Sequence, residues 1–145
     1  DMARRVTFTN TFTPTQTTGC TYTKGWYQNK NGAPTVIGVD GRTKSEAQQI
    51  FAATPGKPGN VTFSGINSLL NLYQQLLAAL NNLGGDLKEH DGPPALDAAI
   101  DAAKLGTGGS GLAITTNLTQ TQIGALTSTL ASFNEGGMTG WPHCP

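Results

Sequence analysis

The two cysteines, Cys20 and Cys144, are the residues of this 145-residue chain with the most direct chemistry. In a reducing compartment they would be two free thiols, whereas in an oxidising one they can bond to each other. A bond between them would close most of the chain into one loop. In the chain-entropy model a loop of that length stabilises the folded state by about 5 kcal/mol. We therefore favour a Cys20–Cys144 disulfide that clasps the domain shut.

The two histidines are the next candidates for acid–base or metal chemistry. His90 lies in the sequence KEHD, where it can act as a base or a ligand, or belong to an ordinary solvated charge cluster. His143 adjoins Cys144 and could activate that thiol as a nucleophile only if the thiol were free. The two histidines and two cysteines are too scattered for a zinc site. We favour a structural role for both histidines.

A pair of carboxylates and a glycine-rich run complete the candidates for catalysis. Asp97 and Asp101 are one helical turn apart and could bind a cation, but Lys104 three residues later favours a solvated helix face. Residues 106–111 are rich in glycine but lack the Lys-Ser/Thr of a phosphate loop, so we interpret them as a mobile linker. We expect no enzyme, no cofactor and no metal site.

Three aromatic residues are candidates for binding a sugar: Trp26, Tyr27 and Trp141. The alternative, which we favour, is that they pack around the disulfide where the two ends of the chain meet. Acceptor triplets for N-linked glycosylation begin at Asn60 and Asn117. Whether such a triplet carries a sugar depends on the host.

The composition narrows the class of partner and the compartment. Charged residues make up 12% of the chain and the formal net charge is zero, so no basic patch for nucleic acid or anionic lipid is predicted. No run of about 18 apolar residues exists, and no membrane span is expected. The chain starts at Asp1 without Met, as a processed mature protein does. These features predict a secreted, extracellular protein of the cell surface.

Helical periodicity dominates residues 43–133 and predicts about four helices. Capping boxes mark two of their starts, at Thr43 with Glu46 and at Thr119 with Gln122, and Ser64 can cap the longest helix. Leu72 lies off the apolar stripe of that helix and predicts a second contacted side. Most of the other face is taken by Asn67, Asn71, Gln74, Gln75, Asn81 and Asn82. The predicted core consists of Leu69, Leu70, Tyr73, Leu76, Leu77, Leu80, Ile100, Leu126, Leu130 and Phe133.

Short strands are predicted at residues 36–39 and 61–63. The fold class is therefore α+β: a mainly helical, disulfide-closed domain over residues 20–145, preceded by an extended β arm over residues 1–19. In the arm, Val6, Phe8 and Phe12 fall on one side of a strand and threonines on the other. An apolar strand outside a closed domain needs a partner, either its own domain or a neighbouring subunit. The predicted subunit contacts are Val6, Thr7, Phe8, Thr9, Asn10, Thr11 and Phe12.

Residues 20–30, CTYTKGWYQNK, resemble the CTYTQGYWKNH opening of a domain found in secreted and surface proteins of bacteria. The likeness continues through a polar helix ending at Thr-Pro and a Leu-rich helix, and closes on GWPHC at residues 140–144, where the family has GPGHC. Trp26 and Tyr27 stand in inverted order, Lys30 replaces a His, and Trp141 departs from the family's ending. The resemblance implies an extracellular closed helical module and no reaction.

Residues 6–11, VTFTNT, resemble the final strand of prealbumin-like repeats in bacterial surface proteins, which often precede such a module. Because the repeat itself is absent here, the strand lacks its usual sheet. We predict a structural subunit of an extracellular bacterial filament or surface appendage, a homopolymer that assembles by adding this strand to neighbouring subunits. The alternative is a non-polymerising surface or adhesin module that binds a polysaccharide through its aromatic residues.

Overall fold

The computed structural model describes residues 18–30 and 32–145, and it has the predicted α+β class. The predicted subunit contacts, Val6 to Phe12, lie outside the described residues. Five α-helices, two short 3-10 helices (η) and three short strands follow one another along the described chain. Their order is α1 (Lys24–Gln28), η1 (Ala33–Thr35), α2 (Lys44–Ala52), β1 (Thr62–Phe63), α3 (Asn67–Leu83), η2 (Asp86–Lys88), α4 (Pro94–Gly106), β2 (Thr107–Gly108), β3 (Ala113–Thr116) and α5 (Gln120–Asn134).

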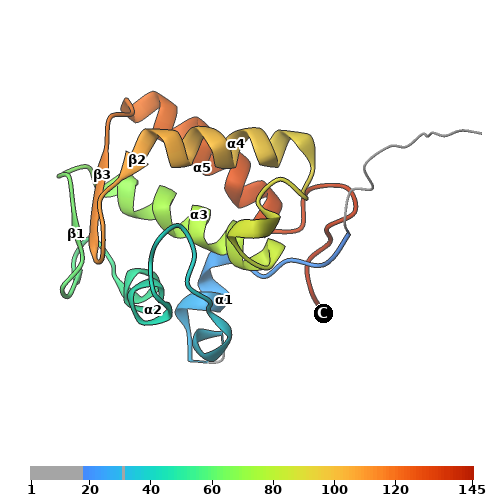
Figure 1. Ribbon diagram of the computed structural model, residues 1–145, viewed down its shortest axis with the longest axis horizontal. Coiled ribbons are helices and arrows are strands. Elements are labelled where there is room, and N and C mark those ends of the chain that lie inside the picture. Colours follow the sequence, from blue (N-terminus) through green and yellow to red (C-terminus); the bar gives the residue numbers. More distant parts are fainter. Residues whose placement is uncertain (1–17, 31) are drawn as a thin grey trace, which may run out of the picture.

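Helix α3 forms the centre of the domain, with α4 and α5 on one side and α1 and α2 on the other (Figure 1). Leu72 is fully buried, which confirms that this helix is contacted on more than one side. Gln74 and Gln75, on the polar face of the helix, are only 2% and 8% exposed. Surrounding elements cover the polar side of the helix as well as its apolar stripe. Of the predicted core, Leu126 is partly buried and the other nine residues are buried.

Both predicted capping boxes are present. The Thr43 hydroxyl accepts a hydrogen bond from the Glu46 N–H, and the Glu46 carboxylate accepts one from the Thr43 N–H. Thr119 and Gln122 repeat this arrangement at the start of α5. The predicted Ser64 cap of α3 is wrong, because the helix begins after Ile66 without a side-chain cap. Residues 62–63 are used by β1, and Gly65 turns the chain with a φ of 82° before the helix starts.

The three strands form one small sheet with β3 in the centre, β1 parallel to it and β2 antiparallel to it. Residues 106–111, predicted as a mobile linker, instead contain β2 and most of the turn into β3. Gly109 makes this turn tight: its φ is 94°, and a Cβ there would lie 2.1 Å from the Ala113 carbonyl oxygen. The strand predicted at 61–63 is present as β1, whereas residues 36–39 are irregular and bury Val36 and Val39 without pairing.

Candidate functional site

The predicted disulfide is present and joins Cys20 to Cys144, with their Cα atoms 4.8 Å apart. Both sulfurs are therefore used, and Cys144 has no free thiol that His143 could activate. The bond makes a covalent loop of the chain between the two cysteines. It also fixes the start of the described chain to the C-terminal tail. Residues 18–19, which join the predicted arm to the domain and form the arm root, therefore have a defined position.

Backbone hydrogen bonds hold the two chain ends together on both sides of the disulfide. The Gly19 N–H donates to the Gly140 carbonyl at 3.2 Å and the Thr21 N–H to the Pro142 carbonyl at 2.8 Å. The Cys144 N–H donates back to the Thr21 carbonyl at 2.8 Å. Figure 1 shows these paired ends at one end of the long axis of the molecule and the three strands at the opposite end. The arm is thus attached far from the sheet of its own domain.

Trp141, one of the three predicted ligand aromatics, is a packing residue of this paired end. Its side chain is only 5% exposed and its ring lies 5.2 Å from that of Phe133. It also lies directly against Gly19, where a Cβ would be 2.8 Å from the indole. The indole face is therefore covered by the chain start and is not an open platform for a sugar.

Trp26 and Tyr27 belong to a second aromatic cluster. Tyr27 is buried, stacks on Phe51 at 5.3 Å and packs edge-on against Trp26. Burial raises the pKa of the Tyr27 phenol above its ordinary value, so it stays protonated and donates to the Asn82 side chain at 2.7 Å. Trp26 is partly exposed and stacks on Tyr22 with ring centres 3.7 Å apart. Of the three predicted aromatic residues, Trp26 reaches the surface, and its partner there is Tyr22, which was not predicted.

Asn82 joins this aromatic cluster to the helices, a role that the sequence analysis missed. Its side-chain oxygen accepts from the Tyr22 N–H and the Tyr27 hydroxyl, and its amide nitrogen donates to the Tyr22 carbonyl and to Asn134. Asn134 is fully buried and donates to Gln75. The chain around α1 is therefore tied to α3 by the half-buried amide of Asn82 and, through it, to the buried amide of Asn134 in α5.

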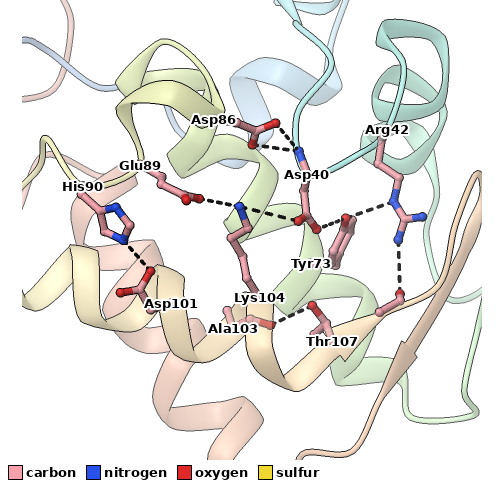
Figure 2. Close-up of polar contacts among 11 residues, drawn as sticks. Asp40, Arg42, Tyr73, Asp86, Glu89, His90, Asp101, Ala103, Lys104 and Thr107 are labelled. Atoms are coloured by element: carbon pink, nitrogen blue, oxygen red, sulfur yellow. Dashed lines mark hydrogen bonds and ion pairs between the residues drawn. The ribbon is translucent and has the colours of Figure 1, made fainter.

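A chain of polar contacts crosses the molecule from η2 to β2 (Figure 2). Lys104 pairs with Glu89 and lies 4.0 Å from Asp40, which accepts a hydrogen bond from the Tyr73 hydroxyl at 2.5 Å. Arg42 donates to the Tyr73 oxygen at 3.0 Å and to the Gly108 carbonyl at 3.2 Å.

These contacts hold a loop that has an unusual backbone conformation. Asp40 has a φ of 55°, a left-handed conformation unusual outside glycine, and its backbone N–H donates to the Asp86 carboxylate. Burial is the main cause that raises the pKa of Tyr73 above its ordinary value, so the phenol stays protonated as a donor. The arrangement holds residues 40–42 between α3, α4 and β2.

Of the charged residues considered for catalysis, His90 and Asp101 are brought into direct contact. His90 contacts Asp101 at 2.7 Å on an exposed surface, whereas Asp97 accepts from the Gly92 N–H at 3.2 Å (Figure 2 shows the first pair). Lys104 turns toward Glu89 and not toward Asp101. Within residues 18–30 and 32–145, no group of three or more His, Cys, Asp or Glu side chains could hold a metal ion.

The sheet end carries two shallow hollows. The first has a volume of about 220 Å³ and lies between the end of α2 and the chain that leads into β1. Its lining consists of Gln49, Ala52, Ala53, Lys57, Pro58, Gly59, Asn60 and Val61. The second, of about 320 Å³, lies along β2 and β3 and is lined by Leu105, Gly106, Thr107, Gly108, Thr115, Thr116 and Asn117.

The described part of the chain contains no helix that is both long enough and apolar enough to cross a bilayer. The described residues thus offer three features for function: a fixed arm root, a partly exposed Tyr22–Trp26 pair and a sheet end with hollows. No protein-family model, curated protein or solved structure matches this chain.

Proposed function

We propose that this protein is the structural subunit of an extracellular bacterial filament or surface appendage, and that it assembles by inserting its N-terminal arm into a neighbouring copy. The observation that carries the proposal is the separation of the arm root from the sheet. The root lies at the disulfide-closed end and the strands lie at the opposite end of the molecule (Figure 1). An arm that starts far from the sheet of its own domain is well placed to pair with the sheet of a neighbouring molecule.

The anchoring of the arm root supports a load-bearing role. The chain passes directly from the arm into a segment that is held by Cys20 and by three backbone hydrogen bonds to residues 140–144. Force applied to the arm therefore reaches a covalent cross-link within a few residues. Such an anchor next to the arm is useful if the arm transmits force between molecules, and less so in a module that only binds a ligand.

The symmetry of the contact favours an open polymer. An arm and an acceptor on opposite ends make a head-to-tail contact, which generates a fibre unless the rotation between copies closes a ring. With a formal net charge of zero, neighbouring copies repel one another little. Each added strand contributes main-chain hydrogen bonds, and each buried apolar side chain about 1.5–3 kcal/mol.

Electron microscopy of the purified full chain tests the proposal. We expect fibres from the wild type, and none after deletion of residues 1–15 or after Phe8→Asp with Phe12→Asp, because buried carboxylates would oppose docking. The matched control carries Phe8→Leu and Phe12→Leu, which keeps apolar side chains, and should still form fibres. A monodisperse wild-type monomer, or fibres that persist without the arm, would contradict the proposal.

A second candidate, a surface module that binds a polysaccharide, rests on the partly exposed Tyr22–Trp26 stack. Flat aromatic faces at a surface suit the apolar faces of sugar rings. To test it, soluble polysaccharides are titrated into the wild type and into Trp26→Phe while the tryptophan fluorescence is recorded. Saturable binding that weakens in the variant supports this function, and an unchanged spectrum at all concentrations contradicts it.

A further inference from the structure

The outer edge of β1 has unused backbone groups. The Thr62 N–H donates inward to the Leu112 carbonyl at 2.9 Å, so the residues on either side of Thr62 direct their backbone groups away from β3. The Val61 N–H is bonded to Pro58 and the Phe63 carbonyl to Gly65. The Val61 carbonyl accepts no hydrogen bond from the described residues, and the Phe63 N–H points away from β3 in the parallel pairing. One acceptor and one donor, two residues apart, are the groups to which a further strand can pair.

An apolar hollow lies beside this edge. It is the smaller of the two described above, and Ala52, Ala53, Pro58 and Val61 supply its apolar lining. Val61 directly precedes β1, so a strand added along the edge would pass next to the hollow and could place a side chain in it. Strand addition takes its affinity from main-chain bonds and its specificity from such side-chain pockets.

The opposite edge of the sheet is a weaker acceptor. The Gly108 carbonyl of β2 already accepts from Arg42, and the Thr107 hydroxyl donates to the Ala103 carbonyl. The hollow along β2 and β3 is lined mainly by threonine and glycine. A strand with alternating large apolar side chains fits the β1 edge better.

The arm has the length and the pattern for the β1 edge of another copy. Residues 1–17 precede the described chain, and 17 residues span at most about 60 Å when fully extended. Residues 13–17 can serve as a spacer between the arm root on one molecule and a strand over residues 6–12 on the next. The alternation of Phe and Val with Thr matches an edge that has a hollow on one side and solvent on the other.

We propose that residues 6–12 of one copy pair with the outer edge of β1 in the next copy, with Phe8 or Phe12 in the hollow beside Ala52. This inference rests on the proposed function and names the acceptor that it requires. The occupant is thus a second copy of this chain.

Photo-cross-linking in assembled material tests the acceptor directly. Phe8 is replaced by p-benzoylphenylalanine in the full chain, mixed with isotope-labelled wild type, irradiated and digested for mass spectrometry. Cross-links from light to heavy chains at residues 49–63 are expected. Fibres whose cross-links fall on residues 105–117, or elsewhere, overturn the acceptor and leave arm-driven assembly standing. Cross-links confined to one chain, without fibres, overturn the proposed function itself.

Two pairs of variants test the edge and the hollow separately. Phe63→Pro removes the outward N–H, whereas Phe63→Ala keeps it, so only the first should abolish pelletable polymer. Ala52→Asp places a carboxylate in the hollow and should reduce polymer about tenfold or more, since docking an apolar side chain there would strip water from the charge. Its control is Ala102→Asp, also exposed and near a helix end. Equal assembly of the two Asp variants, both with wild-type melting curves, would overturn the inference.

Discussion

The indole of Trp141 lies directly against Gly19, with no room for a side chain between them: a Cβ on Gly19 would be 2.8 Å from the ring. The tryptophan is itself held from behind by Phe133, so it cannot move away freely. The start of the described chain is therefore seated on an aromatic surface as well as being cross-linked at Cys20. This seating fixes the direction in which the chain enters the domain.

Gly19→Ala should destabilise the fold and loosen the root of the arm. The added methyl group overlaps the buried indole, and overpacking of this kind typically costs about 1–3 kcal/mol. Urea unfolding followed by tryptophan fluorescence measures the change. The control is Gly56→Ala, where no atom lies within 4 Å of the added Cβ. Equal stability of the two variants would show that Trp141 yields to the new side chain.

Leu77→Ala should lower the free energy of unfolding by about 2–5 kcal/mol, because it leaves a cavity in the fully buried centre of α3. Leu105→Ala serves as the comparison, since Leu105 is 86% exposed and should change stability by less than about 0.5 kcal/mol. Both are measured by chemical denaturation under the same conditions. Similar values for the two leucines would contradict the central position of α3.

Asn82→Ala should cost about 1–3 kcal/mol, because it leaves the Tyr27 hydroxyl and the Asn134 side chain without one of their partners. The matched variant is Asn71→Ala on the same helix, where the side chain is exposed and accepts from Lys24. Thermal melting should separate the two variants clearly. The Tyr27 ring should also become more accessible to nitration in Asn82→Ala, and unchanged nitration would argue that another residue takes over the bond.

His90 should titrate above its ordinary pKa of 6.5, because its hydrogen bond to Asp101 favours the charged imidazole. A raised folded-state pKa means that the pair contributes stability that is fully present below pH 6.5 and is lost as the pH rises through the folded pKa. Because both side chains are exposed, the effect on stability is small and the titration is the better readout. NMR of the imidazole protons measures it, and Asp101→Asn should bring the pKa down; an unmoved titration would rule out the pair.

The helices were predictable because their signals are local. Thr43 and Glu46 need only each other to start α2, and the repeat of leucines along α3 needs only helical geometry. Burial of Gln74 was not predictable, since it depends on the carbonyls of Ile50 and Ala53 arriving beside it from α2. Strand β2 was missed for a similar reason: two residues, Thr107 and Gly108, form a strand only because Thr116 and Thr115 pair with them.

In the candidate site, too, features with local signals were predictable and contacts between distant residues were not. The disulfide was predictable because the chain holds two cysteines and they bracket the helical region. The sequence does not show that Trp141 is covered by Gly19, because the contact joins opposite ends of the chain. The burial of Arg42 depends on Tyr73 and on the Gly108 carbonyl, partners 31 and 66 residues away. Contacts of this range depend on how the helices pack.

The Cys20–Cys144 bond has a consequence for resistance to proteolysis. All described helices and strands lie between these two residues, so they belong to one covalent ring. A protease that cuts a single peptide bond anywhere in that ring opens it without releasing a fragment. A nicked molecule would keep residues 1–19 covalently attached to the sheet. The ring thus lets each molecule tolerate one cleavage before its two ends can part.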